Sequence, residues 1–303
     1  MDQVRLSSLD PTETIWRGPA FDVASPRKLK MPVVFASPHS GRDYPPNFLA
    51  ASRLDALTIR RSEDCYVDEL FRAAPDHGAP LLRAHFPRAY MDVNREPFEL
   101  DPEMFVGKLP GFVNTRSLRV AGGLGTIARI VADGEEIYRG KLSFEDAQQR
   151  VGDLYEPYHE RLRELVADSH HKFGCAALID CHSMPSVGGP MDQDAGLVRA
   201  DVVLGDRHGT SCASSLTDYV EELFNDLGYK VYRNNPYAGG YTTERYGKPL
   251  HGIHTLQIEL NRALYMEEDT LEKKPRFKDL QMDLGKLAER MADVDVTALS
   301  PLL

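Results

Sequence analysis

Short apolar runs alternate with amphipathic stretches along most of the 303-residue chain, and this alternation restricts its possible folds more than any other feature. Stretches with a helical period of 3.6 residues lie at 142–172, 211–227 and 276–293. Strands that alternate with helices predict an α/β fold, with a mixed, mostly parallel sheet and helices on both faces. The runs expected to form buried strands are MPVVFAS (31–37), APLLRAHF (79–86), CAALIDC (175–181), ADVVLGD (200–206), YKVYRN (229–234) and HTLQIEL (254–260).

The region 87–140 interrupts the alternation, because it is rich in proline and glycine and has no long periodic segment. We expect it to form a long irregular insertion that carries short helices, not a separate domain. Residues 1–303 are therefore predicted to form a single catalytic domain. A chain of this length can bury a core that needs no disulfide staples.

Composition excludes several classes of protein. The formal net charge of −10 argues against a nucleic-acid partner, which clustered Lys and Arg would bind. No window approaches 18 apolar residues, and residues 1–18 lack the apolar segment of an export signal. The four cysteines show no CxxC pairing, which predicts thiols rather than a disulfide framework. Together these features fit a cytoplasmic enzyme, as they would fit any soluble enzyme.

Two histidines follow apolar runs directly, at the edge where open α/β sheets bind their ligands. His39 comes after the run 31–37 and before Gly41, and His182 follows the run 175–181. Asp180 lies two residues before His182, so it shares a strand face with the imidazole and can orient it. Each histidine alone is equally compatible with a structural role in a turn. As a pair they indicate a zinc site, which needs three protein ligands and a water.

The third ligand is expected from the acidic pair Glu63 and Asp64, which precedes the amphipathic stretch 65–74. Acidic residues are typical of the first turn of a helix, where they stabilise the positive end of the helix dipole. We therefore expect one of the two to cap the helix and the other to reach the metal. Asp68 and Glu69, one turn further on, are expected to face solvent.

Glu259 interrupts the last apolar run, where an isolated buried carboxylate is costly. An arginine, protonation or a metal-bound water would compensate for that cost. A carboxylate with a raised pKa suits general acid–base catalysis, so Glu259 is a candidate base. A structural salt bridge is the alternative.

Two arginines are candidates for binding an anionic substrate. Arg245 lies in the glycine-containing loop 234–247, where the backbone can approach a ligand closely. Arg95, with Asn94 beside it, follows a short predicted strand at 88–91. Each arginine is also compatible with a surface ion pair.

The segment 208–211 lacks the G-x-S-x-G pattern of a nucleophilic serine. Gly209 instead predicts a turn, and Thr210 or Ser211 predicts the cap of the next helix. No GxGxxG or Walker A run follows a strand, which excludes those nucleotide-binding motifs.

Seven segments taken together resemble the N-formylglutamate amidohydrolase family, whose members are also called N-formylglutamate deformylases of histidine degradation. They span about residues 31–268 and read SPHSGRDYP, SEDCYVDELF, AYMDVNREP, LIDCHSMPS, GDRHGTSC, NNPYAGGYTTERYGKP and HTLQIELNRALYM. The family is similar in fold to zinc carboxypeptidases, aspartoacylases and zinc muramoyl-alanine amidases. The resemblance therefore implies a zinc-carboxypeptidase-like (phosphorylase/hydrolase-like) fold. Those enzymes bind one zinc ion through two histidines and a carboxylate, and a glutamate late in the chain is their base.

Carried over to this sequence, the resemblance implies that His39, Asp64 and His182 bind zinc and that Glu259 is the catalytic base. Asp64 is preferred to Glu63, because an aspartate at that position before the helix matches the family.

The resemblance also implies a substrate and its contacts. Arg245 and Arg95, with Asn94, are expected to bind the two carboxylates of a glutamate derivative. The implied reaction is hydrolysis of N-formyl-L-glutamate to L-glutamate and formate.

Three alternatives remain open at this point. The chain could be a related zinc amidase that removes another N-acyl group. It could be a non-catalytic binder of acidic amino acids on the same fold. Iron or manganese could replace zinc, because two histidines and a carboxylate suit those metals as well. The sequence predicts no oligomeric state.

Overall fold

The structure is a computed structural model that describes residues 16, 18–131, 134–190 and 192–301. By its internal contacts the chain divides into two compact units. The first unit comprises Met1–Asp22, His39–Glu63 and Ala84–Glu160, and the second comprises Val23–Pro38, Asp64–Arg83 and Arg161–Leu303. The segment predicted to lack an export signal lies almost entirely outside the described residues. The single-domain organisation stays a prediction.

A seven-stranded sheet of order β1-β3-β2-β4-β7-β5-β6 organises the second unit. β2 pairs in parallel with β3 and β4, β4 pairs in parallel with β7, and β5 with β6. Only the β5–β7 pair is antiparallel among the strand pairs whose registers are described. The predicted mixed, mostly parallel sheet is therefore confirmed. The strands are β1 (Phe21–Ala24), β2 (Val33–Ser37), β3 (Leu81–Ala84), β4 (Ala176–Met184), β5 (Val202–Gly205), β6 (Val231–Arg233) and β7 (Ile253–Asn261).

Each of the six predicted apolar runs overlaps one strand, and two strand assignments differ from expectation. β1 was not predicted, because its four half-buried residues form no clear apolar run. The strand predicted at 88–91 is wrong, because these residues form a turn in which the backbone N–H of Tyr90 donates to Pro87 O at 2.9 Å.

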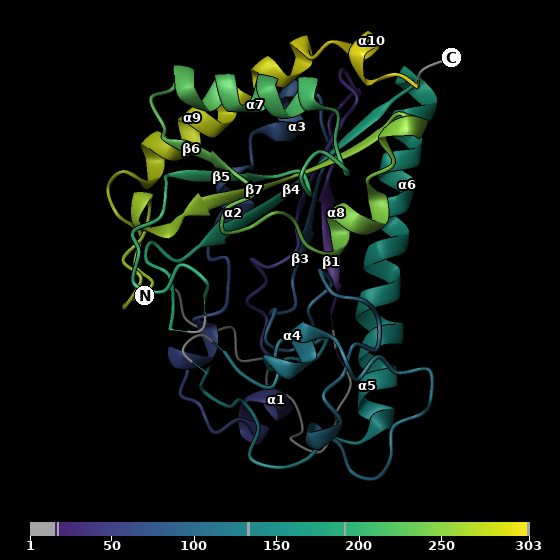
Figure 1. Cartoon of the computed structure of the whole chain (residues 1–303), viewed down its shortest axis with the longest axis vertical. Helices are drawn as coiled ribbons and strands as arrows, with labels where there is room; N and C mark the ends of the chain where they lie inside the picture. The colour runs from purple at the N-terminus through teal and green to yellow at the C-terminus, as the bar shows by residue number, and fades with distance from the viewer. Residues whose placement is uncertain (1–15, 17, 132–133, 191, 302–303) are drawn as a thin grey trace. The chain divides into compact units, whose positions relative to one another are not determined.

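Helices of the second unit pack on both faces of the sheet, as predicted. One face carries the hydrophobic core, in which alternate residues of β2, β4, β5 and β7 meet side chains of α2, α7 and α9. Figure 1 shows α7 and α9 above the strands of the sheet. α8 lies against the other face, since the N–H of Gly240 at its start donates to Gln257 Oε1 on β7. The helices are α2 (Val67–Leu70), α3 (Ala74–His77), α7 (Ser214–Asp226), α8 (Tyr241–Tyr246), η5 (Pro249–His251), η6 (Arg262–Leu264), α9 (Phe277–Arg290), η7 (Met291–Asp293) and α10 (Val296–Leu299).

The first unit is largely irregular, and its 87–140 region carries short helices as predicted. Aromatic packing holds it, with Phe48 between the rings of Tyr90 and Tyr138 at 5.1 and 5.7 Å. The helix predicted at 142–172 starts at a capping box of Ser143 and Asp146 and continues through a π-helical turn. The helices are α1 (Pro46–Ala51), η1 (Thr58–Arg60), η2 (Pro102–Met104), α4 (Leu118–Ala121), α5 (Phe144–Arg150), the π-helix η4 (Val151–Tyr155) and α6 (Glu156–Phe173), which passes into the second unit.

Two expectations from composition can be compared with the structure. Within the described ranges, no helix has the length and apolar character needed to cross a bilayer. All four cysteines are buried and occur as thiols, which confirms the absence of a disulfide framework; they are Cys65, Cys175, Cys181 and Cys212.

Candidate metal and catalytic site

The two central strands of the sheet carry a polar row on one face. The register pairs Asp180 with Gln257 and His182 with Glu259, so these four side chains point to the same side. The intervening residue Ile258 points to the opposite side and belongs to the hydrophobic core. Because β4 and β7 run in parallel, the two predicted residues His182 and Glu259 are neighbours at the carboxyl edge of the sheet.

His182 is held between two carboxylates. Its Nδ1 lies 3.0 Å from Asp64 Oδ2, and its Nε2 lies 2.9 Å from Asp180 Oδ2. All three side chains are at most 3% exposed. Burial alone would lower the pKa of His182, but the carboxylates of Asp180 and Asp64 outweigh that effect and hold its pKa well above its usual value. The predicted contact between Asp180 and His182 is therefore present.

Asp64 also contacts Arg262 and Ser183, which sequence reasoning missed. Arg262 Nη2 donates to Asp64 Oδ1 at 3.1 Å, and Ser183 Oγ donates to the same oxygen at 3.4 Å. Arg262 Nε donates to Ser183 Oγ at 3.1 Å. Their positions in the sequence could have indicated both residues, because Arg262 is the first residue after β7 and Ser183 follows His182. Both therefore stand at the strand ends where ligands bind.

The adjacent acid, Glu63, has a different environment within the first unit. Its carboxylate accepts from Tyr44 Oη at 2.5 Å and from Arg60 Nε at 3.0 Å. The expectation that one of the two acids caps the following helix is wrong. α2 begins after Tyr66, which has a left-handed φ of 67° and provides no side-chain cap.

His39 belongs to the first unit and is bound to an aspartate. Its Nε2 lies 2.7 Å from Asp92 Oδ1, and both side chains are buried. Burial would raise the pKa of Asp92, but the neighbouring side chains of Arg95, His39 and Arg88 outweigh that effect and hold the pKa well below its usual value. The imidazole of His39 is thus held by a carboxylate.

The turn after His39 depends on Gly41. A Cβ atom on Gly41 would lie 2.1 Å from Phe86 O, so no other residue fits without a shift of the backbone.

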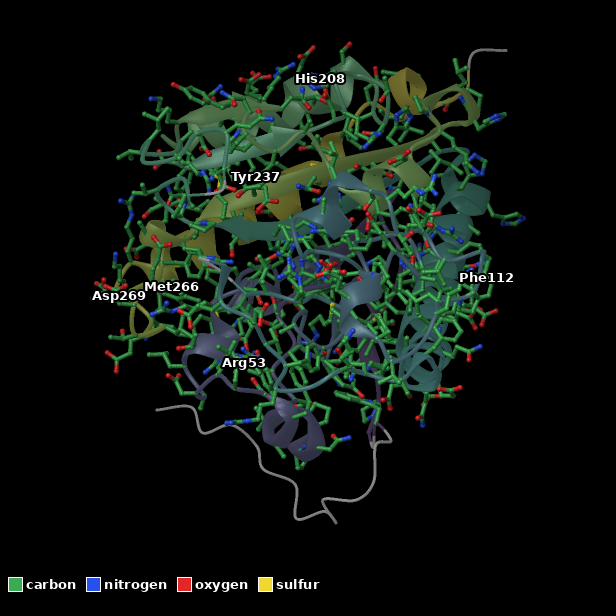
Figure 2. The ribbon with its side chains drawn as sticks, turned by 60° about the horizontal axis from the view of Figure 1, so that its bottom comes forward. Arg53, Phe112, His208, Tyr237, Met266 and Asp269 are labelled. Carbon is green, nitrogen blue, oxygen red and sulfur yellow. The ribbon has the colours of Figure 1, made fainter. Side chains whose placement is uncertain are left out.

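Glu259 is 7% exposed, and its Oε1 accepts from Gln257 Nε2 at 2.8 Å. The orientation of this amide is fixed, because Gln257 Oε1 accepts from the N–H of Gly240 at 2.8 Å. Tyr237, labelled in Figure 2, lies in the same unit. Burial and then the charge of Glu259 raise the pKa of Tyr237 to about 12.

The three predicted substrate-binding residues differ in their surroundings. Arg95 and Asn94 are buried in the first unit, where Arg95 donates to Leu124 O at 2.8 Å and to Asn94 O at 2.7 Å. Burial lowers the pKa of Arg95 to about 10. Arg245 is exposed on α8 of the second unit, and its Nη1 donates to Tyr241 Oη at 2.8 Å.

The segment 208–211 contains the predicted turn but not the predicted cap. Gly209 has a positive φ of 81°. The residue before α7 is Ala213, which has no side-chain cap, and Ser211 Oγ donates to Thr255 O at 2.9 Å. The prediction that Thr210 or Ser211 caps this helix is wrong.

A charged pocket in the first unit is separate from these residues. Arg53, labelled in Figure 2, is 47% exposed and pairs with Glu136 at 3.1 Å, and Glu136 also pairs with Arg129. Exposed ion pairs of this kind contribute little free energy. The pocket contains none of the predicted site residues; it is lined by Arg53, Glu103, Met104, Arg129, Glu136, Tyr138, Arg139, Gly140 and Lys141.

Comparison with known families shows that the strands carrying the polar row lie within a segment that matches a known family. Residues 31–266 match the sequence profile described as N-formylglutamate amidohydrolase. The chain belongs to the N-formylglutamate amidohydrolase family. The matched segment includes every predicted metal ligand and Glu259, together with Arg262, so the resemblance seen in the sequence is confirmed.

Individual members of the N-formylglutamate amidohydrolase family are similar over most of the chain. The N-formylglutamate deformylase of Pseudomonas aeruginosa (PAO1) is 27% identical over 250 residues, which cover 82% of this chain and 86% of that protein. The N-formylglutamate deformylase of Pseudomonas putida is 28% identical over 245 residues, which cover 79% and 83%.

Two solved structures are similar in fold. The crystal structure of N-formylglutamate amidohydrolase from Ralstonia eutropha JMP134 has a TM-score of 0.83 and 37% identity, and the match covers 90% of this chain and 97% of that one. Gene product Atu2144 of Agrobacterium tumefaciens has a TM-score of 0.66 at 19% identity, over 91% and 95% of the chains, and shares the fold alone. The α/β class is thus supported, whereas the zinc-carboxypeptidase-like label stays a prediction.

Proposed function

We propose that the chain is a zinc-dependent amidohydrolase that converts N-formyl-L-glutamate to L-glutamate and formate. One observation carries the proposal: a buried histidine, His182, is held between Asp64 and Asp180, directly across the strand pair from the buried carboxylate of Glu259. Two relatives named N-formylglutamate deformylase support the choice of substrate.

We assign His39, Asp64 and His182 as the zinc ligands. All three are buried, and each offers one ligand atom to a metal ion. The covalent chain limits how far His39 can lie from the sheet. It is two residues beyond Ser37, the last residue of β2, which corresponds to at most about 7 Å of extended chain. β2 pairs with β4, the strand that carries His182.

The carboxylate partners of the two histidines also fit a zinc site. Histidine ligands of zinc usually give their other ring nitrogen to a carboxylate, which fixes the ring. Nε2 of His182 contacts Asp180, and Nε2 of His39 contacts Asp92. We therefore assign Nδ1 of each histidine as its ligand atom. Asp64 Oδ2 already faces Nδ1 of His182. A zinc ion held there would lower the pKa of a bound water towards ~7 and polarise the scissile carbonyl.

Glu259 is assigned as the proton carrier. It accepts a proton from the attacking water, whose oxygen bonds to the formyl carbon, and returns the proton to the nitrogen as the C–N bond breaks. Glutamate then leaves with a neutral amine, and the attacking oxygen is carried off in formic acid, whose proton passes to the amine to give formate and an ammonium group.

The substrate carboxylates are assigned to Arg245 and to Arg95 with Asn94. Arg245 lies on α8, and Gly240 is the N-cap residue of this helix. The backbone N–H of Gly240 donates to Oε1 of Gln257, whose amide contacts Glu259. Arg95 contributes to the charge that stabilises ionised Asp92, the partner of His39. The cytoplasmic location and the role in histidine degradation stay predictions.

The test is hydrolysis of formyl-, acetyl- and succinyl-L-glutamate by the zinc-loaded full chain. We expect the formyl substrate to have the highest kcat/KM. Glu259→Gln should lower kcat by about 100- to 10,000-fold while the zinc content stays near one ion per chain. Glu267→Gln, an exposed acid 3.6 Å from Lys274, is the matched control and should act like the wild type.

Three outcomes would contradict the proposal. A faster release of acetate or succinate would reassign the acyl group. Near-normal turnover by Glu259→Gln would remove Glu259 from the reaction. A full chain that binds acidic amino acids but hydrolyses none of the three substrates would be a binding protein.

A further inference from the structure

The two oxygens of the Asp64 carboxylate have different partners. Oδ2 faces His182 Nδ1 at 3.0 Å. Oδ1 accepts from Arg262 Nη2 at 3.1 Å and lies 3.4 Å from Ser183 Oγ. Asp64 is 1% exposed, so these contacts are not exchanged with bulk water. One oxygen therefore faces the proposed ligand set, and the other is occupied by a buried cation.

Arg262 is held rigidly in the position from which it reaches Asp64. It directly follows β7 and is only 7% exposed. Asn261 fixes the backbone on its N-terminal side, because Asn261 Nδ2 donates to Ala200 O and Asn261 Oδ1 accepts from the N–H of Ala263. Arg262 Nε donates to Ser183 Oγ at 3.1 Å, so two edges of the guanidinium are engaged. A planar guanidinium binds in a fixed geometry that an ammonium group cannot reproduce.

A buried arginine next to a metal ligand needs an explanation, because its charge repels a cation. Taking a guanidinium out of water costs several kcal/mol. If Arg262 served only to neutralise Asp64, the residue would weaken metal binding. If it served to orient the carboxylate, it would strengthen metal binding, because a fixed ligand loses less freedom when the ion binds.

We propose that Arg262, assisted by Ser183, is a positioning residue of the metal centre. Arg262 holds Oδ1 of Asp64, so that the carboxylate offers Oδ2 alone to the ion, beside Nδ1 of His182. This inference rests on the proposed function, in which Asp64 and His182 are zinc ligands. It adds that Asp64 binds through one oxygen and that a cation outside the ligand set fixes which one.

Zinc affinity distinguishes positioning from charge neutralisation. Metal-free full-length protein is titrated with zinc in competition with a chromophoric chelator. For Arg262→Gln we expect the zinc Kd to rise by about 10- to 100-fold, the usual effect of losing a residue that orients a metal ligand. Arg262→Lys keeps the positive charge but loses the planar guanidinium that donates to both Asp64 and Ser183. The zinc Kd of this variant should therefore also rise. Ser183→Ala changes no charge and should raise Kd by a smaller factor.

Arg150→Gln is the matched control. Arg150 is also buried and stacks 4.0 Å from the Tyr90 ring, and it is not part of the proposed centre. This variant should lose stability yet bind zinc with the wild-type Kd.

Each result decides the question. An unchanged or lower Kd in Arg262→Gln and Arg262→Lys overturns the positioning role, even if wild-type protein binds zinc. If Arg262→Gln does not fold, Ser183→Ala and Arg262→Lys decide by the same criterion. A wild-type chain that binds no zinc, or a His182→Ala chain that binds it normally, overturns the proposed metal centre and the positioning role together.

Discussion

Glu63 and Asp64 are adjacent in the sequence but should respond to substitution in opposite ways. Asp64 contacts His182 in the second unit, whereas Glu63 contacts Arg60 and Tyr44 in the first. Replacing each acid by its amide keeps the shape of the side chain and removes the charge. Glu63→Gln should cost stability and leave metal binding intact, whereas Asp64→Asn should lose the metal.

The cost of Glu63→Gln follows from its contacts. The carboxylate is 1% exposed and makes three contacts of 3.0 to 3.2 Å with the guanidinium of Arg60. Breaking a buried pair costs 3–5 kcal/mol, and losing a charged hydrogen bond costs 1.5–3 kcal/mol. Arg60 is 13% exposed and can regain some hydration, so we expect a loss of about 3 kcal/mol. In a chain of this length that corresponds to a fall in Tm of about 5 °C.

Two measurements separate the variants. Thermal unfolding is recorded in excess chelator, because bound metal would otherwise raise Tm by mass action. Zinc affinity is measured by chelator competition at a temperature where all variants are folded. Asp64→Asn should raise the zinc Kd by more than about 100-fold, beyond the effect of losing an orienting residue. If Glu63→Gln loses zinc while Asp64→Asn retains it, the assignment of the third ligand is refuted.

Three further predictions follow from single contacts. Gly41→Ala should lower Tm by several degrees and reduce zinc affinity, because its Cβ would lie 2.1 Å from Phe86 O; unchanged values would show that the turn adapts. Arg245→Gln should raise KM for N-formyl-L-glutamate with little change in kcat, and an effect confined to kcat would exclude a role in binding. Burial raises the pKa of the Cys212 thiol to about 12, so at pH 8 this thiol should react with a thiol reagent only after denaturation, as quantified by labelling and mass spectrometry.

The sequence predicted the strands well because most of them are continuous apolar runs. β4 and β7 are buried along almost their whole length, which gives a strong signal. Polar residues at the ends of such runs stand out, and for that reason His182 and Glu259 could be found without a structure. The prediction failed at 88–91, where apolar residues are buried in a turn instead of a strand.

Apart from the contact between Asp180 and His182, the partners of those residues could not be predicted, because tertiary packing decides which contacts form. Gln257 meets Glu259 two positions along its own strand, and a side-chain period of two permits this contact without showing that it forms. Arg262 meets Asp64 across 198 residues of sequence, which no local pattern encodes. The residues alone left the choice between Glu63 and Asp64 open for the same reason, because consecutive side chains diverge and tertiary contacts decide which one points where.

The register between β4 and β7 links the proposed catalytic residues to the folding of the core. Core and polar residues alternate along both strands, so a deletion of one residue in β7 would turn Glu259 towards Ile179 and Cys181 and expose Ile258 on the polar face. Such a chain would lose the proposed proton carrier from the polar face and would bury its charge in the core. A shift of the register by one residue would therefore remove the proposed base and destabilise the core together.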